Sequence, residues 1–198
     1  MDLTSRPPRA DASRNRNHLL ATARTMLTDH GPDRITMDAL ADCSGLGKGT
    51  VFRHFGTRSG IFQALLDDNE RAFQEGVLSG PPPLGPGASP RERLIAYGQA
   101  RIRFLLEHHD IARAALDGRQ PAPAGSATPL SRIHIRMLLT QLDLGPVDLD
   151  LLAIQLTAAL DGPLLLYLSK SELDATTCPT EQRLTTGWQN LIHRICHP

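Results

Sequence analysis

Apolar residues recur at spacings of three and four along most of this chain, which is the period of an amphipathic helix. No segment shows the sustained alternation of apolar and polar residues that a half-buried strand requires. The pattern predicts helices at about residues 14–30, 36–44, 48–55, 58–78, 90–108, 110–116, 130–142, 147–173 and 180–196. We therefore expect an all-α protein of about nine helices.

The second and third of these helices are separated by a short turn that contains glycine. Thr36 is suited to cap the first of the pair, in which Leu40 and Ala41 fall on one apolar face. Gly45 suits the left-handed conformation that ends a helix, and Gly47 leaves the backbone free to begin another within three residues. Two helices this close must cross steeply, so the pattern predicts a helix-turn-helix.

The second helix of the pair has one apolar side and one polar side. Val51 and Phe55 lie four residues apart, on the side that we expect to be buried. The outward side is small, basic and polar and consists of Lys48, Gly49, Thr50, Arg53 and His54. A short helix with such a face fits the major groove of DNA. However, helical domains that bind no DNA also contain two helices joined by a glycine turn, so the geometry alone leaves both interpretations open.

The order of residues favours the DNA-binding interpretation. The stretch from Ile35 to Phe62 reads ITMDALADCSGLGKGTVFRHFGTRSGIF. Its succession of Thr, Asp, Ala, Ala, Gly, Lys-Gly-Thr, aromatic-Arg-His-Phe-Gly-Thr-Arg and Ile-Phe closely resembles the TetR family of one-component transcriptional regulators. The resemblance is specific over roughly residues 14–66, about a quarter of the chain. It implies a three-helix DNA-binding domain at the N-terminus, followed by a larger helical domain that binds a ligand and dimerises.

The resemblance also implies which residues contact DNA. The chain departs from the usual family pattern at three of the positions concerned. Phe52 stands where tyrosine is usual, and so lacks a hydroxyl that commonly contacts a phosphate. Gly47 replaces a common serine, which removes a side-chain cap from the recognition helix. Arg58 stands where a lysine that contacts a phosphate is frequent. The residues that we expect at the DNA are Thr36, Lys48, Gly49, Thr50, Phe52, Arg53, His54 and Arg58, together with Arg14 and Arg16.

The segment before the first helix is basic and contains two prolines. The opening stretch of residues 1–17 carries Arg6, Arg9, Arg14 and Arg16 and shows no apolar periodicity, and we expect residues 1–13 to be a flexible basic arm. Flexible arginine arms can enter a minor groove of DNA next to the main site. A plain solvated tail is the alternative that the pattern leaves open.

Charge is distributed unevenly over the 198 residues, although the formal net charge is zero. Residues 1–60 carry nine Lys and Arg against six Asp, a net charge of +3, and residues 61–198 carry twelve against fifteen, a net charge of −3. A basic end is what phosphate binding requires, although a solvated basic face would look the same. Three cysteines, no signal peptide and no long apolar run indicate a soluble cytoplasmic protein without a membrane segment.

The last two long helices are the expected dimer surface. Leucines surround so much of the helix at about 147–173 that it needs neighbours on two sides, and the helix at about 180–196 has one sustained apolar face. The resemblance implies a homodimer formed by these two helices, which presents two recognition helices to a palindromic operator. The predicted organisation is an arm at 1–13, a DNA-binding domain at 14–57 and an effector-binding and dimerisation domain at 58–198.

The resemblance implies an unidentified small-molecule effector in the larger domain. The residues that we consider for its site are polar or aromatic ones on otherwise apolar helical faces, although an ordinary core or surface role would explain each of them: Tyr97, Arg101, Phe104, His108, Arg113, His134, Met137, Gln155 and Tyr167. Pro163 should kink its helix, which would either open a cavity or bend the helix around the core.

Neither a metal site nor an enzyme is expected. His193, Cys196 and His197 have helical spacings that could converge on a metal ion, but they lie at the C-terminus, where helices fray. No nucleophile motif or phosphate-binding glycine loop is present, and we expect no cofactor.

Together these features predict a homodimeric repressor that a small molecule releases from double-stranded DNA. The alternative is a helix-turn-helix protein without such an effector, which acts through a protein partner or as an activating or architectural DNA-binding protein.

Overall fold

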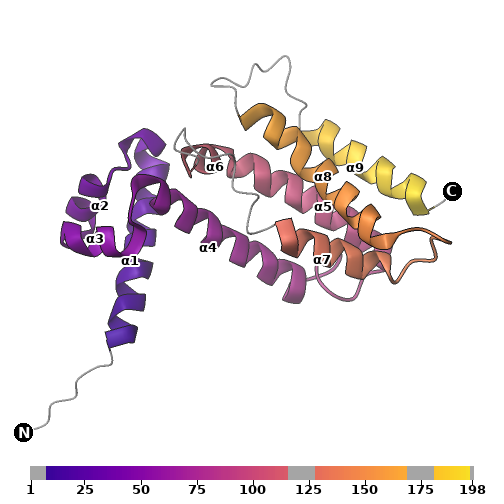
Figure 1. Ribbon diagram of the computed structural model, residues 1–198, viewed down its shortest axis with the longest axis horizontal. Coiled ribbons are helices and arrows are strands. Elements are labelled where there is room, and N and C mark those ends of the chain that lie inside the picture. The colour runs from indigo at the N-terminus through magenta and orange to yellow at the C-terminus, as the bar shows by residue number, and fades with distance from the viewer. Residues whose placement is uncertain (1–7, 116–127, 169–180, 197–198) are drawn as a thin grey trace, which may run out of the picture. The chain divides into compact units, whose positions relative to one another are not determined.

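The computed structural model describes residues 8–115, 128–168 and 181–196, and all regular structure in these ranges is helical (Figure 1). The predicted all-α fold is therefore confirmed. The described elements are α1 (Pro8–His30), the 3₁₀ helix η1 (Pro32–Arg34), α2 (Met37–Ser44), α3 (Lys48–Phe55), α4 (Arg58–Ser79), α5 (Pro90–Glu107), α6 (His109–Ala115), α7 (Thr128–Leu139), α8 (Leu149–Leu168) and α9 (Glu181–Cys196). Within the described ranges, no helix is long and apolar enough to span a bilayer.

The chain divides into two compact units. The first consists of residues 1–68 and 110–118, and the second of residues 69–109 and 119–198. The division falls inside α4, so one half of this helix belongs to each unit. The domain boundary proposed from the sequence, between residues 57 and 58, stands at the start of the same helix.

The first unit has a single apolar core under α1, α2, α3 and the first half of α4. Its buried side chains include Leu19, Leu40, Val51, Phe55 and Phe62, which come from all four helices. Ile111 of α6 joins the same core. The small core fixes the orientation of α3, because Val51 and Phe55 are its inward residues.

Helix α1 begins at Pro8, six residues before the predicted start at Arg14. A proline is tolerated in the first turn of a helix, where its missing N–H has no intrahelical partner, and Asp11 complements the positive end of the helix dipole. The described part of the expected arm is therefore helical rather than irregular, and Arg9 lies within it. Arg6 lies outside the described residues.

The 3₁₀ helix η1 was not predicted. Gly31 precedes it with a φ of 75°, and Pro32 opens it. A helix of three residues has too few positions to show an apolar period, which explains why the pattern did not reveal it.

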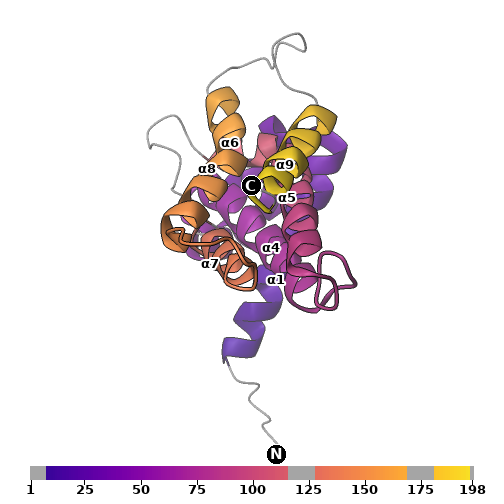
Figure 2. The same cartoon turned by 90° about the vertical axis from the view of Figure 1, so that its right-hand side faces the viewer.

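In the second unit, α5 packs against α9, and α7 packs against α8 (Figure 2). Ser89 and Glu92 form a reciprocal capping box that starts α5 where the sequence predicts. The close packing of α5 and α9 depends on Gly98, because a Cβ atom there would lie 2.0 Å from the indole of Trp188. The same indole donates a hydrogen bond of 3.0 Å from Nε1 to the carbonyl of Leu94.

Helix α8 continues on both sides of Pro163, so the proline does not end the helix. The inner side of α8 contributes Ala153, Leu156 and Leu160 to the core of the second unit. Its described outer side is also apolar, since Leu151 and Ile154 are 51% and 47% exposed. Leu151 and Ile154 are therefore apolar residues of α8 that the core of the second unit does not bury.

Candidate nucleic-acid interface

The residues that cap α2 and α3 are the ones that the sequence predicts. Thr36 accepts a hydrogen bond of 3.0 Å from the backbone N–H of Ala39, and Gly45 ends α2 with a φ of 68°. Gly47 caps α3 with its backbone alone and makes no side-chain hydrogen bond. Gly47 therefore provides no side-chain cap, as the sequence predicts. The first N–H groups of α3 have no side-chain acceptor from this residue.

Helix α3 presents most of the side chains that the sequence assigns to DNA. Lys48, Gly49 and Arg53 are exposed, and Thr50 is half-buried. Phe52 is 52% exposed, although it is a large apolar side chain. The outward face therefore combines cations, a hydroxyl and an exposed aromatic ring, as a helix that enters a major groove would need.

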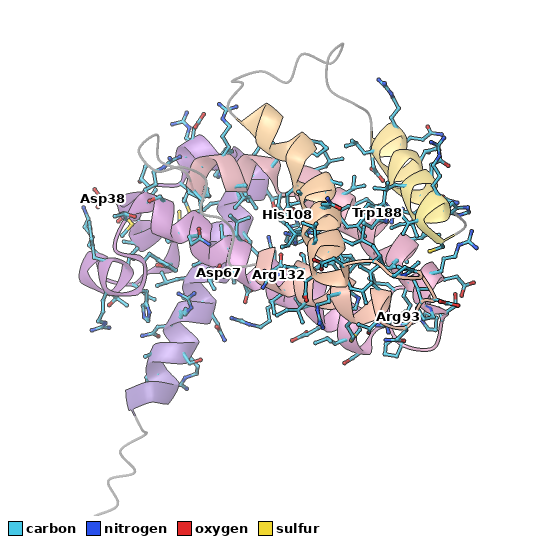
Figure 3. All side chains as sticks on the ribbon, turned by 45° about the vertical axis from the view of Figure 1, so that its right-hand side comes forward. Asp38, Asp67, Arg93, His108, Arg132 and Trp188 are labelled. Atoms are coloured by element: carbon cyan, nitrogen blue, oxygen red, sulfur yellow. The ribbon has the colours of Figure 1, made fainter. Side chains whose placement is uncertain are left out.

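Lys48 forms an ion pair that the sequence analysis did not identify. Its Nζ atom lies 2.9 Å from Oδ1 of Asp38, which belongs to the first turn of α2 and lies at the outer edge of this unit (Figure 3). The hydrogen bond and charge of Asp38 raise the pKa of Lys48. Both side chains are largely exposed, so the pair is weak and Lys48 can exchange Asp38 for another anion. The signal in the sequence was an acidic residue two positions after the cap of α2.

Arg58 has bonds within the protein that the sequence analysis did not foresee. Its Nε donates to the carbonyl of Ile35 at 2.7 Å, and its Nη2 donates to the carbonyl of Pro32 at 2.8 Å. The guanidinium carbon lies 4.9 Å from the ring centroid of Phe62. These contacts tie η1 to the start of α4 and explain a cation in the first turn of a helix without any phosphate. The DNA contact of Arg58 stays a prediction, to be made by its remaining N–H groups.

His54 is only half exposed, and its Nε2 atom is buried without a hydrogen-bond partner among the described residues. Burial first, and then the charges of Arg53 and Arg16, lower the pKa of this imidazole. His54 is therefore neutral near pH 7, so any contact with DNA would be that of a neutral ring and not of a cation.

Arg14 and Arg16 lie on α1 rather than on a flexible arm. Arg14 forms an ion pair with Asp11, one turn earlier in the helix. Arg16 places its guanidinium carbon 5.7 Å from the ring centroid of Phe55, at the end of α3. Of the two, Arg16 is therefore held next to the recognition helix.

The match with a known family covers these elements. Residues 19–65 match the family model described as "Bacterial regulatory proteins, tetR family", a range that includes α2, α3 and the first part of α4. The chain carries a TetR-family helix-turn-helix domain. The resemblance noted in the sequence is confirmed, and the family consists of transcriptional regulators rather than enzymes.

Sequence relatives of the TetR-family segment are themselves described as regulators. An uncharacterised HTH-type transcriptional regulator of Mycobacterium tuberculosis is 32% identical over 100 residues, which is 50% of this chain and 45% of that protein. An HTH-type transcriptional regulator of Staphylococcus aureus is 36% identical over 69 residues, 34% of this chain and 36% of that protein. The chain thus spans less than half the length of these relatives.

Solved structures with the TetR fold match nearly the whole chain. A TetR-family transcriptional regulator from Pectobacterium atrosepticum has a TM-score of 0.76 and 18% identity over 97% of this chain and 99% of its own. A TetR-family regulator from a Rhodococcus species has a TM-score of 0.65 and 18% identity, over 93% and 99% of the two chains. The TetR architecture therefore extends over both units.

The residues considered for an effector in this TetR-like second unit separate into two groups. Tyr97, Arg101 and Phe104 repeat every three or four residues along one side of α5, and His108 caps the end of this helix. The ring of His134 of α7 lies against that of Tyr97, with ring centroids 4.8 Å apart. The remaining four residues do not join this group. Arg113 belongs to the first unit, Met137 and Gln155 are exposed, and the side chain of Tyr167 lies outside the described residues.

This group contains polar and charged side chains that are buried. Arg101 is 4% exposed, and its Nη1 donates to Oε2 of Glu70 at 2.5 Å. Tyr97 donates its hydroxyl proton to Ser131 at 2.7 Å, and burial raises the pKa of this phenol to about 12. Burial, followed by the charge of Arg93, lowers the pKa of His134 to about 4.

The histidines and the cysteine at the C-terminus show no metal-binding arrangement in the part of the chain that the structure describes. No group of three His, Cys, Asp or Glu side chains suited to a metal occurs there. His193 accepts a hydrogen bond of 3.0 Å from Arg91 at Nδ1, and burial raises the pKa of Cys196. His197 lies outside the described residues.

Proposed function

We propose that this chain is a transcriptional repressor that binds a palindromic DNA operator as a homodimer and leaves it when a small molecule binds the second unit. The observation that carries the proposal is the outward face of α3, with Lys48 and Arg53 exposed, within a TetR-family domain. A regulator of bacterial DNA acts in the cytoplasm, which is the location that we propose.

The exposed side of α8 supports the dimer. Leu151 and Ile154 lie three residues apart on the side away from Ala153 and Leu156, and they are about half exposed. Leu191 of α9 is 37% exposed. Large apolar side chains grouped on two helices favour burial against an apolar partner, and a second copy of the same surface satisfies this requirement with two-fold symmetry.

Release by a ligand requires that the ligand binds the released conformation more tightly than the DNA-bound conformation. Helix α4 belongs to both units. A ligand that shifts the second half of α4 would therefore also move its first half, because the helix is continuous. The polar group around Arg101 and Glu70 includes a residue of this second half. These features support the second unit as the place where a ligand acts.

The decisive experiment selects binding sites from random-sequence DNA with the purified protein and then measures affinity by fluorescence anisotropy. We expect a site with two-fold symmetry. Replacing Lys48 and Arg53 together by alanine should weaken binding at least about tenfold. It should also reduce the slope of log affinity against log salt concentration by up to about four, because a dimer would lose two cations from each recognition helix.

Arg132→Ala is the matched control, because Arg132 is an exposed cation of α7 outside the TetR-family domain. It should leave both affinity and salt slope unchanged. If Lys48→Ala/Arg53→Ala bound the selected DNA as tightly as the native chain, the proposed interface would be wrong. DNA binding that no small molecule changes would favour the effector-free alternative.

A further inference from the structure

One side of α5 carries a row of charged and aromatic residues that faces the interior of the second unit. Arg93, Tyr97 and Arg101 follow each other at four-residue intervals, so they share this side of the helix. Glu70 of α4 and His134 of α7 contact the row from neighbouring helices. The row on α5 therefore lies against the second half of α4 and against α7.

Three nitrogen atoms, two in this row and one on the neighbouring helix α7, have no hydrogen-bond partner among the described residues. They are Nε of Arg93, Nε of Arg101 and Nε2 of His134, and all three atoms are buried. Arg101 and His134 are only 4% and 6% exposed. A buried polar atom without a partner costs free energy, and it commonly marks a place where a ligand or a water completes the bonding.

The unpartnered atoms of the two arginines can only donate. An arginine Nε–H has no lone pair to accept a hydrogen bond, so its missing partner must offer an acceptor atom. The acidic groups nearby are already committed, because Glu70 accepts from Arg101 and also from Nε2 of Gln74 at 2.7 Å. The ligand chemistry that fits is therefore rich in acceptors.

The aromatic side chains next to the row argue against a cationic ligand. The guanidinium carbon of Arg101 lies 5.7 Å from the ring centroid of Phe73 and 5.0 Å from that of Phe104. The protein's own cation thus occupies the position over these rings that a ligand cation would take. Phe73 and Phe104 are only partly buried, so each ring has surface that the apolar body of a ligand could contact.

Two cations and two acidic side chains lie around the row. Arg93 and Arg101 are the cations, and Glu70 and Asp161 are the acidic residues. Burial is the main cause that raises the pKa of Asp161, and Glu70 raises it further, whereas Arg101 opposes both. The charge of Glu70 is offset by its ion pair with Arg101, and the raised pKa of Asp161 means that its carboxylate takes up a proton more readily than a free one.

We propose that the second unit binds a small organic carboxylate beside Tyr97, with the carboxylate accepting a hydrogen bond from the Nε–H of Arg101 and the apolar body lying against Phe73 and Phe104. The inference rests on the proposed function, because it gives the chemical class of the effector. A carboxylate at a guanidinium forms a charge-assisted hydrogen bond, which is stronger than a neutral one and strengthens further in a buried site.

The test compares three probes of nearly the same shape on the full chain by isothermal titration calorimetry. Benzoate carries a carboxylate, benzamide is its neutral analogue and benzamidine is a cation. We expect benzoate to bind at least about tenfold more tightly than benzamide, and benzamidine not to bind. Equal affinity of benzoate and benzamide, preference for benzamidine, or no binding of benzoate up to about 10 mM would overturn the proposal.

The first variant removes both members of the buried ion pair, so that no unpaired charge remains. Glu70→Gln/Arg101→Gln should weaken benzoate binding at least about tenfold. The matched control is Arg103→Gln/Glu181→Gln, which removes an exposed ion pair of 2.9 Å between α5 and α9 and should leave benzoate affinity unchanged. Equal loss in the two variants would contradict the assignment to Arg101.

Asp161→Asn provides a second variant that does not disturb the ion pair. Asparagine imitates the protonated carboxyl group, so benzoate should bind as tightly as to the native chain or more tightly. Weaker binding of benzoate to Asp161→Asn would count against the proposal even if the first variant did not fold. Site selection on DNA is independent of these titrations, so a failure of carboxylate binding is distinguishable from a failure of the proposed regulator function.

Discussion

Arg58 and Phe52 show how far single residues of the DNA-binding unit can be understood from sequence. The family pattern places Arg58 at a phosphate, whereas the structure gives its guanidinium two carbonyl partners at Ile35 and Pro32. Those carbonyls are 23 and 26 residues away in sequence, so no local pattern could reveal the bonds. For Phe52 the sequence suffices, because its exposure follows from the helical position of Val51 and Phe55.

Phe52 leads to a prediction at the scale of one atom. Phe52→Tyr adds a hydroxyl to a ring that is 52% exposed on the outward face of α3. We expect operator affinity to rise about fivefold for each recognition helix that contacts the operator, which corresponds to about 1 kcal/mol for one net hydrogen bond to a phosphate. Fluorescence anisotropy with the selected site measures this change. Thermal unfolding serves as the control, since an exposed hydroxyl should leave the melting temperature unchanged, and unchanged or weaker affinity would argue against the placement of Phe52 at DNA.

At the scale of elements, local signals predict helix ends better than they predict which side of a helix is buried. The caps at Thr36 and Gly45 are local, and the structure confirms them. The rotation of a helix about its axis depends on distant packing. Met137 and Gln155 interrupt apolar faces in the sequence, yet α7 and α8 turn both side chains to solvent.

The contact between α5 and α9 gives a prediction at this scale. Gly98→Ala would place a Cβ atom 2.0 Å from the ring of Trp188, so either the indole or the helices must move. We expect a loss of roughly 1–3 kcal/mol in the free energy of unfolding, measured by urea denaturation.

Gly187→Ala is the matched control for this prediction. Gly187 lies on α9, and a Cβ atom there meets nothing within 4 Å. Because alanine favours a helix more than glycine does, this variant should be neutral or more stable by up to about 1 kcal/mol. Similar losses in both variants would show that packing against Trp188 is not responsible.

At the scale of the whole molecule, the proposed dimer depends on the outer side of α8. Leu151→Glu/Ile154→Glu places charges on this apolar surface, so burying it against a second copy would require desolvating them. We expect a monomer in analytical ultracentrifugation and operator binding weakened at least about tenfold, because two linked recognition helices bind more tightly than one.

Ile133→Glu is the comparison for the dimer surface. Ile133 is 58% exposed on α7, so the same chemical change is made on an apolar side chain outside α8 and α9. This variant should remain a dimer. If Ile133→Glu were monomeric while the α8 variant stayed dimeric, the two copies would associate through another surface. The sequence suggested α8 as a partner surface because leucines surround it, but only the structure shows which of its apolar residues are exposed.

The exposed ion pair between Lys48 and Asp38 has a consequence for how the protein would discriminate among DNA sequences. If Lys48 contacts a phosphate, that phosphate must first displace a carboxylate that is always present, so each encounter with DNA begins with a local competition. On random DNA, a phosphate only replaces Asp38 as the partner of Lys48, so this contact adds little to the free energy of binding. On the operator, contacts from the rest of α3 add to the exchange. Asp38 would thus compete with phosphates for Lys48 and shorten the time that the protein spends bound to DNA other than its operator.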